Sequence, residues 1–289
     1  MKSGRALHLC AGWQHPWSAT APFWDDFFRE LHLPCSVHED LDEGCAALEK
    51  QDHDLLVVSA LRWSMAQNER FAPHRAQWAY DIPHAARAAI AQHLEKGGAL
   101  LAIHAASISF DSWPEWEDML GGRWVWDQSG HPPYGPIQTR IIRKDHPMTR
   151  GVADFESIDE VYGSLRRSCD STVLAESRAS GQACMPTVWC REWRGARICY
   201  DALGHNMASF TAPDHRRLLH HPPARPHRRQ QQWLTPLRSM PAVWTLADRA
   251  CCSSVLRARA SPISRSGWCT APGRSLGILC RRSWSPTIR

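Results

Sequence analysis

The stretch from Gly97 to Ser107, GGALLAIHAAS, constrains the fold more than any other part of the chain. Residues 99–103 are all apolar and do not alternate with polar ones, which is typical of a central parallel strand covered on both faces. His104 follows directly, and the small residues behind it permit a sharp turn. Such a turn holds one side chain at the carboxyl edge of a sheet, where open α/β folds bind ligands. We therefore predict that His104 serves proton transfer or metal ligation, with a core histidine bonded to a loop as the alternative.

The first 219 residues alternate short apolar runs with amphipathic segments. Strands separated by helical crossovers predict an α/β fold with a mostly parallel central sheet and helices on both of its faces. The expected strands cover residues 6–10, 36–38, 54–59, 99–103, 137–143, 154–165, 171–176, 186–191 and 196–201, and the expected helices cover 22–33, 42–51 and 83–95, with another beginning at 214–219.

The last 70 residues differ in composition from the rest of the chain. Residues 220–289 contain twelve arginines, no lysine and one acidic residue, Asp248, so this segment carries +11. The preceding residues hold 22 basic and 28 acidic side chains, a net charge of −6. We predict a domain over 1–219 and a tail over 220–289, which is either a disordered basic segment or an out-of-frame translation product. The basic balance of the whole chain therefore does not indicate nucleic-acid binding.

Several classes of protein are excluded by what the sequence lacks. No apolar run approaches the ~20 residues of a membrane span, and no signal peptide is evident, so we expect a cytoplasmic protein that does not bind membranes. The eleven cysteines form no CxxC pair, which argues against a disulfide framework or a zinc ribbon. Neither GxGxxG nor GxxxxGK[ST] occurs, so no nucleotide cofactor is expected.

Two further segments carry side chains suited to catalysis. The run ARICYDALGH is a predicted strand that ends in a glycine turn at His205, at the same sheet edge as His104. In DEVY, strand alternation places Glu160 and Tyr162 on one face, where a carboxylate and a phenol can serve as acid and base or orient sugar hydroxyls. A solvated acidic strand edge is the alternative. We predict His104, Glu160 and His205 as the catalytic group, within about 10 Å of one another.

Residues after the predicted strands supply candidates for substrate binding. In the loop GHPPYGP, two prolines stiffen the chain around His131 and Tyr134. Tryptophans at strand ends suit stacking on the apolar faces of sugars, although they can equally be packing residues. The candidate substrate-binding residues are Trp13, His15, Trp63, His131, Tyr134 and Tyr162.

The order and spacing of these motifs resemble the ThuA-like, or trehalose-utilisation, family of the class I glutamine amidotransferase-like superfamily. The resemblance covers residues 6–219 and rests on GW, WSM, KGGALLAIHAAS, WPEWEDMLGGRW, HPPYGP, DHPMTRGV, DEVY, PTVWCREW and ALGH. It implies a flavodoxin-like three-layer fold in which His104 replaces the elbow cysteine of the amidotransferases.

The resemblance also implies a role in carbohydrate metabolism. The expected substrate is a sugar, of the type of a 3-keto-disaccharide made by a partner oxidoreductase, and the expected chemistry is acid–base catalysis by His104, Glu160 and His205. Two alternatives remain open. One is a sugar-binding or regulatory module without catalysis. The other is a metal-dependent hydrolase or isomerase with His104, His131 and His205 around one divalent ion.

Overall fold

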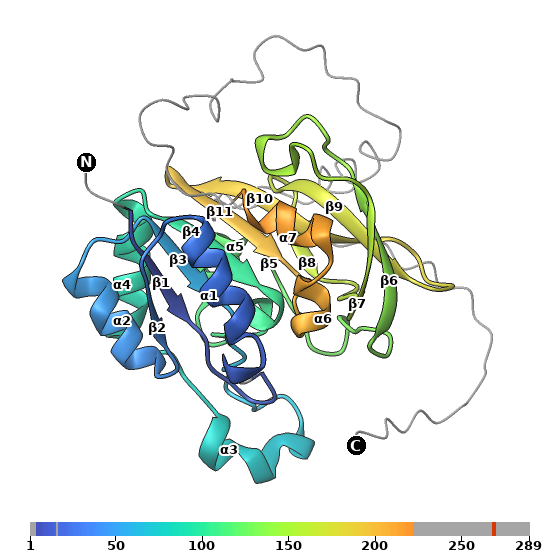
Figure 1. Cartoon of the computed structure of the whole chain (residues 1–289). Helices are drawn as coiled ribbons and strands as arrows, with labels where there is room; N and C mark the ends of the chain where they lie inside the picture. The colour runs from blue at the N-terminus through green and yellow to red at the C-terminus, as the bar shows by residue number, and fades with distance from the viewer. Residues whose placement is uncertain (1–3, 16, 222–267, 270–289) are drawn as a thin grey trace, which may run out of the picture.

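A nine-stranded sheet forms the middle layer of the protein, and helices cover both of its faces (Figure 1). The computed structural model describes residues 4–15, 17–221 and 268–269. The strand order is β2-β1-β3-β4-β11-β10-β9-β6-β7. The strands are β1 Ala6–Leu9, β2 Cys35–His38, β3 Leu55–Val58, β4 Ala99–Ile103, β6 Gly135–Ile141, β7 Phe155–Asp159, β9 Thr172–Ala179, β10 Met185–Trp193 and β11 Ala196–Asp201. The helices are α1 Ala21–Glu30, α2 Leu41–Lys50, α3 Ala72–Trp78, α4 His84–Glu95, α5 Pro114–Leu120, α6 Met207–Phe210 and α7 Pro213–Leu219.

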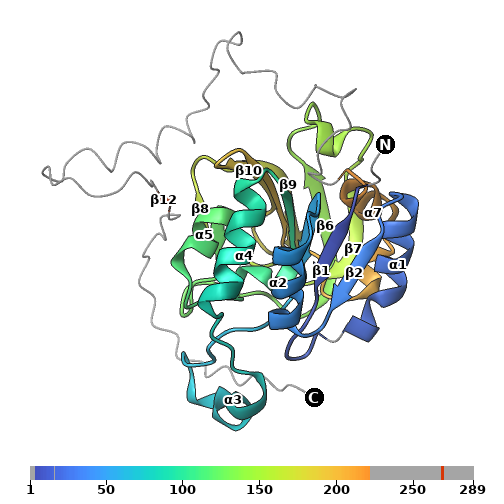
Figure 2. The same cartoon turned by 90° about the vertical axis from the view of Figure 1, so that its left-hand side faces the viewer.

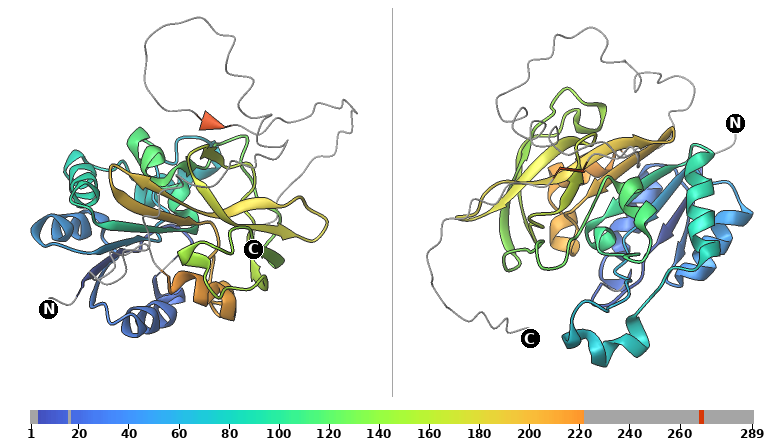
Figure 3. Two further views of the ribbon diagram at one scale, coloured as in Figure 1. Left: turned by 90° about the horizontal axis from the view of Figure 1, so that it is seen from above. Right: turned by 180° about the vertical axis from the view of Figure 1, so that it is seen from behind.

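The sheet has a parallel part and an antiparallel part, which lie side by side in Figure 3. The parallel part holds the blue-to-teal strands and the gold strand β11, and the antiparallel part holds the green and yellow strands. The five strands from β2 to β11 run parallel, and β10, β9, β6 and β7 continue the sheet with antiparallel pairing. The predicted α/β class is therefore confirmed, and the parallel strands make up five of the nine in the sheet. A second, small sheet contains β5 Gly122–Arg123, β8 Arg166–Ser168 and β12 Trp268–Cys269.

Apolar and polar residues do not alternate in β4 because, as predicted, both faces of the strand are covered. Every residue of the strand is at most 1% exposed. Leu100 and Ala102 pack in the cluster that includes residues of α2, α4 and α5. Leu101 and Ile103 pack on the opposite face, with residues of α1, α6 and α7 (Figure 2). Burying an apolar side chain stabilises the fold by about 1.5–3 kcal/mol, so β4 is a central element of both layers.

Differences from the expected elements lie mainly in connections and strand ends. The strand expected over 154–165 ends at Asp159, and a separate strand, β8, follows it. The short helix α3 was not predicted. No helix in the described part of the chain is long and apolar enough to cross a membrane. Apart from residues 220, 221, 268 and 269, the predicted tail lies outside the described residues.

A buried ion pair fastens α7 to the end of β11. His215 Nε2 lies 2.9 Å from Asp201 Oδ2, and the two side chains are 0% and 1% exposed. The other carboxylate oxygen of Asp201 accepts a hydrogen bond from the Leu203 backbone N–H. The pair therefore holds both the last described helix and the turn that leads to His205. Burial alone would lower the pKa of His215, but the Asp201 carboxylate, with a smaller contribution from Asp159, raises this pKa above its ordinary value.

Removing one partner of this pair leaves an unpaired charge in the core, which typically costs about 3–5 kcal/mol. We therefore expect His215→Ala to lower the free energy of unfolding by about that amount, measured by urea denaturation. Glu95→Ala is the matched control, because it removes the exposed Arg194–Glu95 pair, whose side chains are 63% and 48% exposed. This control should change stability by less than about 1 kcal/mol. Equal losses in the two variants would contradict the assigned role of the buried pair.

The raised pKa of His215 also predicts a pH dependence of stability. A group that binds its proton more tightly in the folded state stabilises the protein below its unfolded pKa, about 6.5 for histidine. This stabilisation is lost as the pH rises through the folded-state pKa. The reference is the double variant Asp201→Asn/His215→Gln, in which neither side chain titrates. The difference in unfolding free energy between wild type and reference should be largest near pH ~6 and shrink toward pH ~9. A difference that grows with pH would refute this expectation.

Candidate active site

The candidate site lies where the neighbouring parallel strands β4 and β11 end. Ile103 of β4 pairs with Asp201 of β11, so both chains leave the sheet at the same carboxyl edge. His104 begins a 3-10 helix, His104–Ser107, with φ 49°, a left-handed conformation that costs about 1–3 kcal/mol in a residue other than glycine. The Tyr200 hydroxyl donates a hydrogen bond to the His104 carbonyl oxygen at 2.8 Å and helps to hold this turn. The sharp corner predicted at His104 is therefore observed.

Hydrogen bonding fixes which nitrogen of His104 faces the site. Nδ1 lies 2.8 Å from the carbonyl oxygen of Ala202, which can only accept, so Nδ1 carries a proton. Nε2 points the other way and lies 3.0 Å from the Tyr162 hydroxyl and 3.2 Å from His205 Nδ1. The side chain is 3% exposed. Nε2 is therefore the ring nitrogen that faces the site.

Glu160 lies between the three imidazoles of His104, His205 and His131. Its Oε2 is 3.5 Å from His104 Nε2 and 3.4 Å from His205 Nδ1, and its Oε1 is 3.7 Å from His131 Nδ1. Burial alone would raise the pKa of Glu160, but the hydrogen bonds to His104 and His205 hold this pKa well below its usual range. Burial likewise opposes protonation of His104, yet Glu160 and the charge of Asp159 raise the pKa of His104.

His15 completes a group of three histidines. The ring of His15 lies 5.3 Å from that of His104 and 5.1 Å from that of His205, centroid to centroid. His15 Nδ1 lies 3.2 Å from the carbonyl oxygen of Trp13, so Nδ1 donates and Nε2 keeps its lone pair. Burial lowers the pKa of His15 to about 3. One nitrogen from each of the three rings lies within 4.8 Å of the others, a spacing that can hold a metal ion.

The buried carboxylate of Asp159 joins the two segments that carry these side chains. Asp159 Oδ1 accepts hydrogen bonds from the backbone N–H groups of Glu160 at 2.8 Å and His205 at 3.2 Å. Its Oδ2 accepts from the Gly204 N–H at 2.8 Å. The solvated acidic edge considered for the DEVY segment is therefore wrong, since Asp159 is 0% exposed. Strand alternation alone could not reveal this residue, because its partners Gly204 and His205 lie 45 and 46 positions away.

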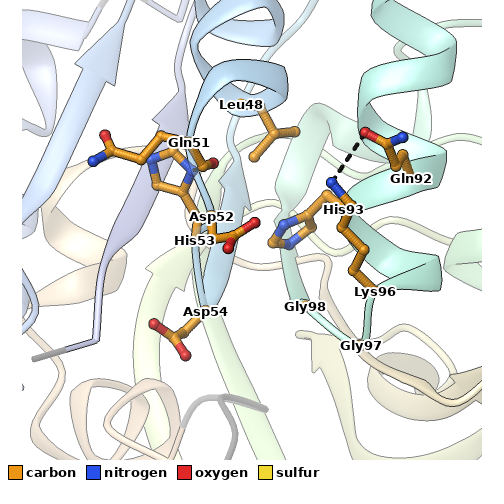
Figure 4. Close-up of a pocket in the computed structure, with 10 residues that line it drawn as sticks. All are labelled: Leu48, Gln51, Asp52, His53, Asp54, Gln92, His93, Lys96, Gly97 and Gly98. Atoms are coloured by element: carbon orange, nitrogen blue, oxygen red, sulfur yellow. Dashed lines mark hydrogen bonds between the residues drawn. The ribbon is translucent and has the colours of Figure 1, made fainter. Parts of the chain in front are cut away.

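The cavity at the three histidines is small. Its volume is about 110 Å³, and Ser59 and Asn206 also line it. A larger cavity of about 590 Å³ lies at the opposite, amino-terminal edge of β3 and β4, where His53, His93 and Lys96 face it (Figure 4). His93 Nε2 bonds the carbonyl oxygen of Ala99, and burial lowers the pKa of this ring. Three imidazoles, those of His15, His104 and His205, converge at the smaller cavity. Glu160 lies against two of them, so this cavity is the candidate site.

The structure places the predicted substrate-binding residues at different depths. Tyr162 is buried against His104, whereas Tyr134 is 41% exposed and donates a hydrogen bond to Asn206 Oδ1. Trp63 is only 1% exposed because Phe71, Trp13 and Trp126 cover its ring.

Two expectations about these residues need correction. The prediction that Trp63 stacks on a sugar is wrong, since its indole is a core side chain. Trp13 is half-buried in the same aromatic group. The predicted metal set of His104, His131 and His205 is also wrong, because His15 takes the place of His131 in the cluster. His131 lies against Glu160 instead.

Comparisons with known proteins agree with this architecture. The family model described as ThuA, trehalose utilisation, matches residues 54–221. The fold is similar to that of a ThuA-like protein from Parabacteroides merdae, with a TM-score of 0.60 and 15% identity over 77% of this chain and 89% of that one. A ThuA-like protein from Bacteroides uniformis gives a TM-score of 0.53 and 20% identity over 77% of this chain and 91% of that one. None of the curated proteins matches the chain.

A cytoplasmic protein from Salmonella typhimurium LT2 also shares the fold, with a TM-score of 0.50 and 14% identity over 72% of this chain and 91% of that one. At these identities the three structures establish the flavodoxin-like fold alone. The family model covers more than half of the sequence, including the ends of β4 and β11 and the segment with Glu160. The chain thus belongs to the ThuA, or trehalose-utilisation, family.

Proposed function

We propose that this protein is an enzyme of sugar catabolism that acts on a 3-keto-disaccharide by proton transfer. The observation that carries the proposal is the contact of His104 Nε2 with Tyr162, His205 and Glu160, at 3.0, 3.2 and 3.5 Å. Histidine and glutamate are the usual groups for acid–base catalysis. Membership of a trehalose-utilisation family supports a disaccharide as the substrate class.

The charges of Glu160 and His104 assign a role to each of these two residues. Two imidazoles lie within 3.5 Å of Glu160 Oε2, so this group is a carboxylate and serves as the base. His104, beside that carboxylate, carries the positive charge and serves as the acid. Tyr162 orients the ring through its hydroxyl group.

Oxidation at C3 of a sugar makes the hydrogen on C2 acidic, because the carbanion is stabilised as an enolate. In the proposed reaction Glu160 takes this proton, and the electron pair moves through the enolate to break the C1–O glycosidic bond. His104 then protonates the departing oxygen. The products are an unsaturated keto-sugar and a free sugar, so no oxidant is consumed.

This route suits a site with one available carboxylate. Ordinary glycosidases need two carboxyl groups across the bond that breaks. Both oxygens of Asp159 are occupied by backbone N–H groups, which leaves Glu160 as the carboxylate free for catalysis beside His104. The substrate requires a separate oxidoreductase to form its 3-keto group, and we propose such an enzyme as the metabolic partner.

Substitution of either member of the pair should abolish proton transfer. We expect Glu160→Gln and His104→Gln to lower the turnover of 3-keto-trehalose by about 10²–10⁴-fold, measured by chromatography of the released sugars. His53→Gln is the matched control, since His53 lies at the other end of the strands, in the larger cavity. Full activity in Glu160→Gln would remove Glu160 from the mechanism.

The same assay separates an enzyme from a binding module. Unoxidised trehalose should yield no product, because its C2 hydrogen is not acidified. Binding of both sugars without any product from the keto-sugar would favour the non-catalytic alternative and overturn the proposal.

A further inference from the structure

We propose that His15, His104 and His205 bind one divalent transition-metal ion, with Glu160 beside an open fourth position. This inference rests on the proposed function in that it concerns the same pocket. It changes the source of the positive charge, which the ion supplies in place of the proton on His104. Glu160 remains the base, and in this version its carboxyl group also returns the C2 proton to the departing oxygen.

The distances match those of a tetrahedral centre. Zinc–nitrogen bonds of about 2.0–2.1 Å at tetrahedral angles place neighbouring ligand atoms about 3.3–3.4 Å apart. His104 Nε2 and His205 Nδ1 are 3.2 Å apart. Glu160 Oε2 lies 3.5 and 3.4 Å from these two nitrogens, at the distance of a neighbouring ligand or of a base that contacts a metal-bound oxygen. The ligand nitrogen of His15 lies within 4.8 Å of the others, so a small rotation of its ring closes the set.

The unpaired nitrogen of His15 is the second, independent observation. No group in residues 4–15 or 17–221 forms a hydrogen bond with the buried Nε2 atom. Leaving a buried polar atom unsatisfied costs about 1–3 kcal/mol, so such an atom needs an explanation. A cation shared with His104 and His205 gives the lone pair a partner.

The surrounding hydrogen bonds have the form expected of metal-binding histidines. Such residues usually donate their second ring N–H to a carbonyl or carboxylate group, which fixes the tautomer. Here His104 donates to Ala202 and His15 donates to Trp13, so both Nε2 lone pairs point inward. Asp159 positions the third ligand, because it holds the backbone of His205.

The donor set indicates the class of ion. Three imidazoles favour zinc, cobalt, nickel, copper or iron over magnesium and calcium, which prefer oxygen ligands. Three protein ligands with an open position are typical of catalytic rather than structural zinc sites. A keto or hydroxyl oxygen of the sugar can occupy that position, next to the Glu160 carboxylate. The ion would then stabilise negative charge on the oxygen of the enolate.

The experiment measures metal binding by the full chain without substrate. Chelator-treated wild-type protein is titrated with Zn²⁺ by calorimetry and with Co²⁺ by visible spectroscopy, which reports tetrahedral coordination. We expect each of the two ions to bind at one and the same histidine site per chain. His15→Gln and His205→Gln should each weaken binding at this site by at least about 100-fold, more than the loss for an outer-shell residue. His53→Gln is the matched control and should retain the affinity of the wild type.

Thermal unfolding shows whether each variant folds, and Zn²⁺ should raise the melting temperature of the wild type but not of His15→Gln. The eleven cysteines can also bind zinc, but they are common to all variants, so the difference between variants isolates the histidine site. A wild type without a zinc site, or a folded His15→Gln with undiminished affinity, would overturn the inference.

The two proposals can fail separately. If the protein binds no metal but still converts the keto-sugar in a reaction that requires Glu160, only the metal proposal is refuted. A histidine metal site in a protein that leaves the keto-sugar unchanged would refute only the sugar chemistry.

Discussion

The site depends on the hydrogen bonds that the Asp159 carboxylate accepts from three backbone N–H groups. These bonds connect the end of β7, in the antiparallel part of the sheet, to the turn after β11, in the parallel part. Glu160 and His205 thereby receive fixed backbone positions next to His104. Hydrogen bonds to a charged acceptor are roughly twice as strong as neutral ones, so a single buried carboxylate can hold two loops together.

A group of buried charges near the sheet edge requires compensation. Asp159 and Asp201 are both 0% exposed. Asp159 is the last residue of β7 and Asp201 is the last residue of β11, and both strands lead into the site. Backbone N–H groups neutralise Asp159, and the His215 ring neutralises Asp201. In the part of the chain that the structure describes, the ion-pair partners of Glu160 are all imidazoles, so its charge, unlike that of Asp159, depends on a proton or a cation beside it. The chemistry proposed for the pocket follows from this difference between Glu160 and Asp159.

Local sequence patterns predicted the part of the site that depends on strand ends. An apolar run followed by a turn identified His104 and His205, because neighbouring parallel strands bring their carboxyl ends together whatever the rest of the chain does. The same patterns could not show that Trp63 is covered by other aromatic rings, nor that His15 replaces His131. Both facts depend on contacts between segments far apart in the chain. Asp159 was missed for that reason as well, since a residue that bonds distant backbone amides leaves no periodic signal.

The volume of the pocket limits how a disaccharide can bind. Cavities that enclose drug-sized ligands measure about 300–1,000 Å³, whereas the cavity at the three histidines measures about 110 Å³. The cavity is too small to enclose a whole disaccharide, so under the proposed function most of the substrate lies outside it. Tyr134, which is 41% exposed with its ring 5.2 Å from that of His205, stands at this boundary. The proposed function therefore assigns the reaction to buried residues, and the selection of the sugar to exposed residues such as Tyr134 and His131.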